Sequence, residues 1–468
     1  MAFWTRRKPI ESEPPEGQRL QRTLSWPHLI ALGVGAIVGT GIYTLIGVGA
    51  GLAGPGVIVS FAIAGAVCVC VALAYAELAA MMPASGSAYT YSYSALGEGA
   101  AWLVGWALIL EYSVVVSAVA VGWSGYATSF LAAVGIDLPL ALTQGPHVAG
   151  GMINLPAIAI IVAVAGLLLV GTRESATINA VLVAVKLAAL LAFLAIAAPH
   201  FDAARFEPFM PFGFAAHRAG DATVGVMAAA AIIFFAFYGF DAVSTAAEET
   251  KNPGRDLAIG IVGSMALCTA LYMAVAAAAI GAMDYGLFAS STEPLAYIVR
   301  TLSGDAAAAW IAGAAVVAIP TVVLAFLYGQ SRIFFVMARD GLLPRRWAAL
   351  DSRTGAPFAV TLLTVIVTAG LAGFLRLDEI AALANAGTLA AFVAVAVSLL
   401  ALRRSAPERP RPFRAPLAWF IAPAAMIGCA YLFISLPLET IGRFFIWMAL
   451  GAPVYLLFGA RESVLARP

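Results

Sequence analysis

Long stretches of apolar residues alternate with short polar connections along almost the whole chain. Twelve such runs fall at 28–52, 55–81, 87–134, 152–171, 175–198, 222–248, 257–282, 306–338, 357–375, 379–402, 414–436 and 440–460. About 20 apolar residues in a helix cross the hydrocarbon core of a bilayer. The pattern therefore predicts an all-α integral membrane protein with twelve transmembrane helices. The third run exceeds that length, so it is either one long tilted helix or a helix preceded by an interfacial segment.

Composition agrees with a membrane protein and excludes some partners. Of the 468 residues, 62% are hydrophobic and 11% are charged, whereas about 25% of a soluble domain is charged. The net charge is +1, and no basic stripe with interleaved aromatic residues occurs, so no nucleic-acid partner is expected. Residues 1–27 are polar and rich in proline, and we expect them to form an N-terminal arm rather than a signal peptide.

The basic residues predict the orientation of the chain. If the third run is one span, both termini lie on the same side of the membrane. Twenty lysines and arginines then fall on that side and five on the other, while Lys186 lies within a span. Cytosolic loops carry the excess of basic residues in membrane proteins. Both termini are therefore expected in the cytosol, and the preference for arginine over lysine is typical of a GC-rich bacterial genome, which would place the protein in a bacterial plasma membrane.

Two of the predicted spans are interrupted near their centres. Residues 35–43 read GAIVGTGIY and carry a Gly-Thr-Gly triplet, and residues 234–249 contain Gly239 and Asp241. Glycine weakens a helix, and an unwound backbone is tolerated in a membrane only where protein buries it or it lines a cavity. We therefore expect both spans to break, although the same glycines would also suit close helix packing.

Matching interruptions in the first and sixth spans are typical of transporters built from inverted repeats. Five spans in each set make the second set begin from the opposite side of the membrane. The sequence then divides into a first five-helix repeat at 28–198 and a second at 222–402. Residues 403–468 add helices 11 and 12 and the C-terminal tail outside the repeat.

The broken spans predict a binding site that is built mostly from the backbone. The freed amides of Thr40 and Gly41 begin a half-helix, whose positive dipole end suits a carboxylate. Carbonyls at the ends of the preceding half-helices suit an ammonium group, and the candidates are Ile37, Phe235, Ala236 and Tyr238. An α-amino acid carries both charges about one residue apart. It is therefore the expected substrate.

Lys186 lies in the middle of the fifth span, about 18 Å from its cytosolic end at the rise of an α-helix. A lysine cannot reach water over that distance, so its side chain must point into the bundle. Two roles remain open. The amine could lose and regain a proton during a transport cycle, or it could stay charged and hold the frayed carbonyls of the first span.

Two acidic residues within the spans are further candidates for a functional role, and the histidines and cysteines are candidate metal ligands. Glu111 is the one acid in the middle of the third span, and it could select cationic side chains, titrate in a proton path or serve a structural role. Asp241 follows the second interruption and is expected to be the N-cap of the next half-helix. The four histidines and four cysteines lack the spacing of a metal site, so neither a metal nor a cofactor is expected.

Several motifs together resemble the amino acid–polyamine–organocation superfamily, and within it the bacterial members of the cationic amino acid transporter branch. The resemblance covers residues 22–460. It is carried by GAIVGTGIY at 35–43, MPASGSAYTYSY at 82–93, LILEY at 108–112, Lys186 and FFAFYGFDAVSTAAEETKNPGRD at 234–256. It implies a LeuT-like fold of two five-helix repeats with broken helices 1 and 6, and proton-coupled amino acid uptake by alternating access.

The resemblance also assigns roles to single residues. The backbone substrate contacts of the family match six residues here, Ile37, Thr40, Gly41, Phe235, Ala236 and Tyr238. Lys186 matches the coupling lysine, and Glu111 matches a pocket acid. Phe237 and Phe240 would be gate or pocket-wall residues. Residues 319–322 of the eighth span carry no acid, which favours small or hydrophobic neutral amino acids over cationic ones.

The expected partners are therefore an amino acid, protons and the lipid bilayer, and a small accessory membrane subunit is left open. The nearest alternative function is an amino acid or polyamine exchanger on the same fold. A sensor that does not transport would usually carry an extra soluble domain. An intramembrane enzyme would need a cluster of catalytic side chains at membrane depth, whereas the ionisable residues in these spans are scattered singly.

Overall fold

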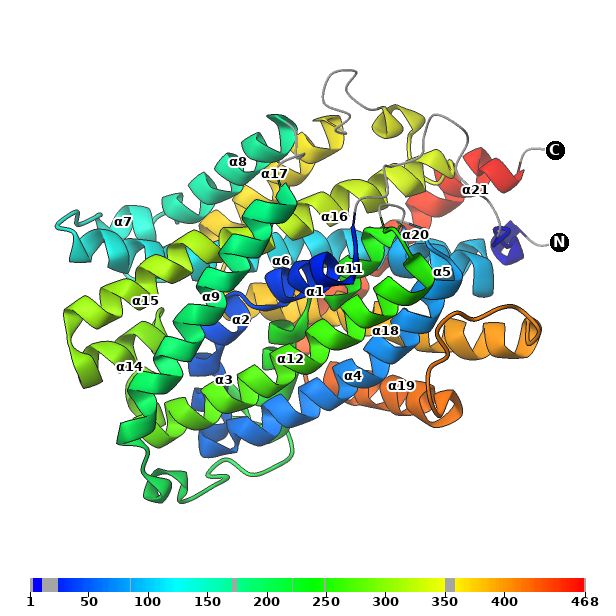
Figure 1. Ribbon diagram of the computed structural model, residues 1–468. Helices are drawn as coiled ribbons and strands as arrows, with labels where there is room; N and C mark the ends of the chain where they lie inside the picture. The colour runs from blue at the N-terminus through cyan, green and yellow to red at the C-terminus, as the bar shows by residue number, and fades with distance from the viewer. Residues whose placement is uncertain are drawn as a thin grey trace.

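The computed structural model describes residues 3–10, 24–84, 86–170, 175–220, 222–247, 250–349 and 358–466, which form a bundle of helices (Figure 1). The helices before the sixth apolar run are α1 (Trp26–Ile37), α2 (Thr40–Tyr43), α3 (Leu45–Ala53), α4 (Val57–Met81), α5 (Ser87–Ala95), α6 (Glu98–Ala133), α7 (Leu140–Thr143), α8 (Leu155–Val170) and α9 (Ser175–Ala197). They are followed by α10 (Val226–Ile233), α11 (Phe240–Thr245), α12 (Pro253–Ala282), α13 (Tyr285–Phe288), α14 (Pro294–Ser303), α15 (Asp305–Ala318), α16 (Pro320–Arg339), α17 (Phe358–Phe374), α18 (Leu377–Ser405), α19 (Ala418–Ile434), α20 (Leu438–Val454) and α21 (Ala460–Glu462).

Eight helical segments are long and apolar enough to cross a membrane, judged by length and composition among the described residues. They are Leu45–Met81, Glu98–Ala133, Val181–His200, Val226–Thr245, Pro253–Ala282, Asp305–Arg339, Leu377–Ser405 and Leu438–Glu462. Four shorter apolar helices, α1, α8, α17 and α19, account for the remaining apolar runs. Every predicted run thus forms mainly helix where the structure describes it, apart from the two central interruptions, the turn at Gly97 and a few residues at the starts of runs.

The long third run contains one membrane-length helix and a shorter helix before it. The chain turns between α5 and α6 at Gly97, whose φ of +112° is disfavoured for residues with a side chain. All nine residues of α5 are buried, although the helix is rich in serine and tyrosine. This segment is therefore packed inside the protein and does not lie at an interface. Some of its hydroxyl groups have protein partners, such as that of Tyr89, which donates to Asp340 at 2.9 Å.

A short β-hairpin departs from the prediction of a purely helical chain. Strand β1 (His217–Ala219) pairs with β2 (Ala222–Val224) in antiparallel register, with His217 opposite Val224. Gly220, in the turn, has a φ of +61°, which glycine adopts at no steric cost. Strand β1 lies in the predicted connection before the sixth run, whereas β2 occupies the first three residues of that run, where the hydrophobic pattern predicts a helix.

Four helix pairs account for much of the packing that positions the centre of the molecule. Helix α4 runs along α12, α6 packs against α18 and α16, and α1 packs against α12. Figure 1 places both chain termini at the same end of the bundle, next to α5 and α21. Helices α7, α14 and α15 lie at the opposite end.

The first described residues of the N-terminal arm are docked on the bundle. The backbone amide of Glu98 donates to the carbonyl of Arg6 at 2.8 Å. The Nζ atom of Lys8 lies 2.7 Å from Oδ1 of Asp340 at the end of α16. The arm thus joins the start of α6 to the end of α16, whereas residues 11–23 lie outside the described part of the chain.

A buried carboxylate holds the loop between α18 and α19. Glu77 of α4 is fully buried and accepts hydrogen bonds from Arg403 at 2.5 and 3.0 Å, from Arg411 at 3.0 Å and from the amide of Ala415 at 2.7 Å. About nine-tenths of each arginine side chain is buried. A carboxylate with four donors is well compensated for leaving water, so the pairing with loop arginines joins α4 to the end of α18.

Glu77→Gln will lower the thermal stability of the purified protein markedly. It leaves two buried guanidinium groups without their counter-charge, a change that typically costs about 3–5 kcal/mol. Heating the detergent-solubilised protein and measuring the remaining monodisperse fraction by size-exclusion chromatography checks this. The control is Asp378→Asn, which removes an exposed ion pair with Arg376 at 3.0 Å and should change little. Equal stability of the two variants would show that the Glu77 pairing is not structural.

Candidate functional site

The first apolar run is interrupted where its glycines predict. Helix α1 ends at Ile37, Val38 and Gly39 are extended, and the chain resumes helical geometry at Thr40. A side chain at Gly39 would place its Cβ 2.7 Å from Cγ2 of Val322 in α16. The close approach of α16 therefore requires glycine at this position.

The sixth run is interrupted in a related way. Helix α10 ends at Ile233 and continues as one turn of 3-10 helix, η5 (Phe234–Phe237). Tyr238 is extended with φ −63° and ψ 151°, and Gly239 has a φ of +115° before α11 begins. This positive φ explains why the interruption contains a glycine.

The two interruptions lie against each other. A Cβ atom at Gly41 would overlap the Cα atom of Ala236, and one at Gly239 would lie 2.6 Å from the carbonyl carbon of Ala36. The backbone of the first break therefore touches the backbone of the second at two points. Since Thr40 and Gly41 are the first residues of α2, their amides have no carbonyl one turn earlier in that helix to bond.

Lys186 holds the end of the first half-helix. Its Nζ atom donates to the carbonyls of Gly35 at 2.7 Å and Val38 at 2.8 Å, and to Oγ1 of Thr321 at 2.8 Å. An ammonium group has three donors, and each of them has an acceptor here. The lysine is fully buried, as its position in the sequence predicts, and it joins α9, α1 and α16 at one point.

Tyrosine hydroxyl groups bond other carbonyls of the first break. Tyr272 of α12 donates to the carbonyl of Ile37 at 2.8 Å, and Tyr126 of α6 donates to that of Tyr43 at 2.5 Å. The hydroxyl of Tyr43 in turn donates to the carbonyl of Lys186 at 2.9 Å. The carbonyl of Ile37, expected to be unpaired, therefore has a protein partner. Its second lone pair is the one left for another donor.

Asn385 of α18 holds the end of the second half-helix, a role that the sequence analysis missed. Its Nδ2 atom donates to the carbonyls of Ala231 at 2.6 Å and Ile232 at 3.0 Å. Its Oδ1 atom accepts a hydrogen bond from the hydroxyl of Tyr238. An asparagine inside an apolar span was the available signal, because a buried amide requires partners.

Asp241 stabilises the second break but is not its N-cap. The N-cap of α11 is Gly239, and Asp241 is the second residue of that helix. Its Oδ1 atom accepts from the amide of Gly239 at 3.2 Å, and its Oδ2 atom accepts from the hydroxyl of Tyr112 at 2.7 Å. The carboxylate thus joins the break to α6 instead of accepting from the amides that follow it.

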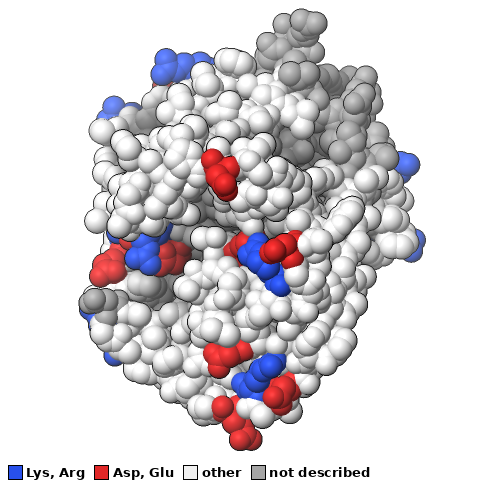
Figure 2. Space-filling model, turned by 90° about the vertical axis from the view of Figure 1, so that its left-hand side faces the viewer, with Lys and Arg blue, Asp and Glu red and all other residues white. Residues whose placement is uncertain are grey.

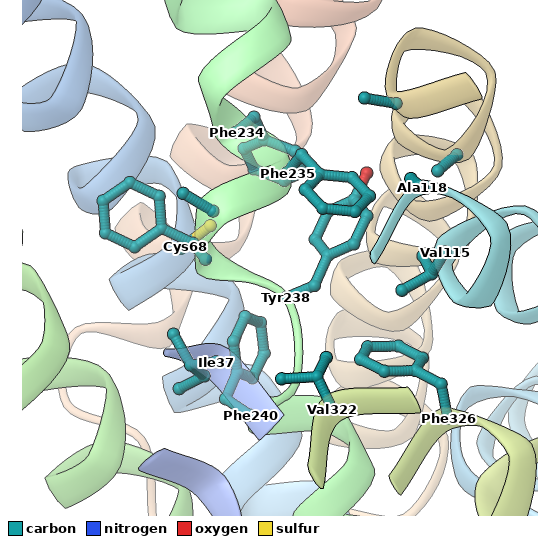
Figure 3. Close-up of a cluster of buried hydrophobic side chains, with 14 of the residues drawn as sticks. Ile37, Cys68, Val115, Ala118, Phe234, Phe235, Tyr238, Phe240, Val322 and Phe326 are labelled. Atoms are coloured by element: carbon teal, nitrogen blue, oxygen red, sulfur yellow. The ribbon is translucent and has the colours of Figure 1, made fainter. Parts of the chain in front are cut away.

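Apolar side chains surround one side of the paired breaks. Figure 3 shows Phe235 and Tyr238 pointing from the second break toward Val115 and Ala118 of α6. Val322 and Phe326 of α16 close the lower part of the same region. This group of six side chains, called the apolar wall below, contains no Asp, Glu, Lys, Arg or His.

The two other aromatic candidates lie away from the apolar wall. Phe237 packs edge-on against Phe61 of α4 and lies 5.3 Å, centroid to centroid, from Tyr272 of α12. Phe240 packs against Tyr75 of α4 and Phe392 of α18. Both side chains therefore fix the broken sixth run to the helices behind it.

Glu111 is buried without a hydrogen-bond partner on either carboxyl oxygen among the described residues. It lies on α6, and a side chain at Gly387 of α18 would place its Cβ 3.3 Å from that of Glu111. A buried carboxyl group without partners is costly, which is typical of functional positions.

Two interrupted helices in backbone contact, inside a bundle of membrane-length helices, define a multi-pass membrane transporter. The family model described as amino acid permease matches residues 24–458, and the chain belongs to this family, within the amino acid–polyamine–organocation superfamily. The resemblance seen in the motifs is thus confirmed. The protein is a transporter and not an enzyme.

Curated relatives extend over nearly the whole chain. The branched-chain amino acid permease BcaP of Bacillus subtilis is 43% identical over 95% of this chain and 95% of its own length. The methylthioribose transporter of the same bacterium is 41% identical over 99% of this chain and 100% of its own. The vacuolar cationic amino acid transporter 2 of Arabidopsis thaliana is 40% identical over 87% of this chain and 64% of its own.

Asn385→Ala will reduce transport strongly. It removes the donor to two buried carbonyls and the partner of Tyr238, and each buried polar group left unpaired costs about 1–3 kcal/mol. Initial uptake rates of amino acids by cells, normalised to the amount of protein in the membrane, check this and should fall about tenfold or more. Ser398→Ala is the matched control, since this buried serine of α18 bonds only the carbonyl of Ala394 in its own helix. A near-normal rate in Asn385→Ala would contradict the role given to this residue.

Proposed function

We propose that the protein is a proton-coupled symporter that takes L-amino acids into the cell by alternating access. The observation that carries this proposal is the backbone contact between the two breaks, at Gly41 with Ala236 and at Gly239 with Ala36. Main-chain dipoles at such a contact can bind both charged ends of an amino acid, and the contact can open on either side. The amino acid permease family and the permease BcaP support the substrate class.

Twelve spans in two inverted five-helix repeats, 28–198 and 222–402, with helices 11 and 12 after them, form the proposed architecture. Its support is the equivalence of the contacts in the two halves. Lys186 of the fifth span bonds the carbonyls that end α1, and Asn385 of the tenth bonds those that end α10. The packing is also reciprocal, since α1 contacts α12 in the second half and α10 contacts α4 in the first.

Both termini are proposed to face the cytosol of a bacterium, with the protein in the plasma membrane. The excess of basic residues in the connections on one side supports this orientation. The two chain ends lie at one end of the bundle, as the orientation requires (Figure 1). The proposal does not include the small accessory membrane subunit that the sequence analysis leaves open.

The substrate carboxylate is proposed to bind the amides of Thr40 and Gly41. Its ammonium group would use free lone pairs of the carbonyls at Ile37, Phe235, Ala236 and Tyr238. The side chain of the substrate would then face the apolar wall, which favours small or hydrophobic neutral amino acids. Glu111 is the residue through which a cationic side chain could still be accepted, because its carboxyl group has no partner among the described residues.

Lys186 is proposed to couple the proton to the first break. As long as it carries its proton, it donates to two carbonyls of α1 and to Thr321 of α16. Loss of the proton would remove the charge and leave fewer donors than acceptors, so the end of α1 would be released from α16. Proton binding and the geometry of the break would then depend on each other, as thermodynamic linkage requires.

Two alternatives share this fold. One is an exchanger of amino acids or polyamines. The other is a carrier of a neutral thioether sugar, favoured by the 41% identity to a methylthioribose transporter. Such a substrate lacks both charges, so it would use the hydrogen-bonding groups at the breaks and not their dipoles. A sensor that does not transport is a weaker alternative.

Lys186→Met will abolish accumulation driven by a pH gradient in proteoliposomes. The variant keeps a side chain of similar length but cannot carry a proton. Wild-type protein should concentrate the amino acid inside proteoliposomes when the external solution is acidic, even if the proteoliposomes contain no amino acid at the start. Counterflow activity of the variant should show that the variant is folded. The control is Lys251→Met, at an exposed lysine.

Accumulation by Lys186→Met with an unchanged pH profile would end the coupling hypothesis. Wild-type uptake that strictly requires internal substrate would instead identify an exchanger.

Valine, leucine and isoleucine will stabilise the purified protein against heat more than lysine and arginine do. The apolar wall gives their side chains a favourable environment, and a ligand at 100 times its Kd contributes about 2.7 kcal/mol. Thermal unfolding with each amino acid and with methylthioribose, at equal concentrations, checks this. Stabilisation by methylthioribose alone would favour the second alternative.

A further inference from the structure

A cavity lies at the end of the molecule opposite the termini, away from the paired breaks. Its volume is about 770 Å³, and it is bordered by the last turns of α6, the segment after α6, the segment before α14, and the first turns of α15. Pockets that bind small molecules have volumes of about 300–1,000 Å³, so an amino acid fits. Figure 2 shows the face of the molecule at this end, where acidic and basic side chains gather in small mixed groups on an otherwise uncharged surface.

The charged residues that line the cavity are unbalanced. Asp137, Glu293 and Asp305 are acidic, and Arg300 is the basic residue among the lining side chains. Hydroxyl groups from α6 and the neighbouring segments also line it, among them that of Ser129. The lining therefore favours a ligand that carries a positive charge. A metal ion is a poor candidate, because the described residues contain no group of three or more His, Cys, Asp or Glu side chains placed to hold one.

One carboxylate of the cavity has acceptor capacity that the protein does not use. Glu293 is 7% exposed, and its Oε1 atom accepts from Arg300 at 2.7 Å. Its Oε2 atom is buried and has no hydrogen-bond partner within the described part of the chain. The terminal torsion of a glutamate is broad, so a small rotation can present this oxygen to the cavity. A buried acceptor without a partner is costly, and an ammonium group would satisfy it.

Arg300 can bind the opposite charge of the same ligand. It donates to Ser129 at 3.1 Å and to Glu293, and its Nε atom lies 3.5 Å from Oδ1 of Asp305. A guanidinium group has five N–H donors, and these contacts use three of them. Its remaining donors suit a carboxylate. The cavity thus combines a carboxylate with a spare acceptor and a guanidinium with spare donors.

We propose that this cavity is a second binding site, for a zwitterion with a primary ammonium group. This second site is formed by side chains, whereas the site at the breaks is formed by the backbone. The inference rests on the proposed function for the identity of the zwitterion as an amino acid. In the proposed orientation the cavity faces the outside of the cell, so it would bind the amino acid before the site at the breaks does.

The cavity is connected to the first break through one turn of α6. A Cβ atom at Gly125, which lines the cavity, would lie 2.9 Å from the carbonyl oxygen of Thr292. The next residue, Tyr126, donates to the carbonyl of Tyr43 in the break. A ligand that shifts Thr292 and Glu293 therefore acts on the turn that holds the break.

The test measures equilibrium binding of radiolabelled leucine to the purified full-length protein. Wild-type protein should bind leucine in two components, and Glu293→Gln should weaken the weaker component about tenfold or more, since it removes a charge-assisted hydrogen bond. The tighter component should stay unchanged in this variant. Asp378→Asn is the control, because it breaks an ion pair at the same end of the molecule that does not line the cavity.

A second variant keeps the test valid if Glu293→Gln does not fold. Ala309→Trp fills the cavity from α15 without removing a charge, and it should abolish the weaker component. A single component in wild-type protein, or a weaker component that both variants retain, overturns the second site and leaves the proposed function standing. Loss of the weaker component in a protein that does not transport amino acids would overturn the proposed function and leave the second site standing.

Discussion

The structure depends on satisfying backbone carbonyls where two helices stop inside the bundle. A carbonyl without a partner is costly away from water, so a broken helix at membrane depth persists only if other groups supply donors. Lys186 supplies them for the end of α1 and Asn385 for the end of α10. These two side chains come from helices far apart in the sequence. They satisfy the unwound backbone inside the bundle.

The difference between the two donors has a consequence for mechanism. An ammonium group can lose its charge, whereas an amide cannot, so of these two donors only Lys186 can respond to protons. The second break is held by neutral groups and by Asp241 and Tyr112. The supports of the two breaks therefore differ in their chemistry.

Glycine contributes by allowing backbone contact as well as by interrupting helices. Gly41 and Gly239 each lie where a side chain would collide with the opposite break. The ion pairs serve another purpose, since Glu77 and Asp340 bind loop and arm residues at the end of the bundle that carries the termini. The cavity at the other end, with Glu293 and Arg300, adds a charged region built from side chains.

Hydrophobic periodicity, the placement of basic residues and a few glycines were enough to predict the helices, the two interruptions and the burial of Lys186, because each follows from local composition and from the exclusion of water. The family resemblance could be read from contiguous motifs for the same reason. Hydrogen bonds between segments far apart in the chain could not be predicted from the sequence. The sequence alone could not show that Asn385 bonds the end of α10, that Tyr272 occupies the carbonyl of Ile37, or that Gly239 and not Asp241 is the N-cap. Those outcomes depend on which helices pack together, and only the tertiary structure decides that.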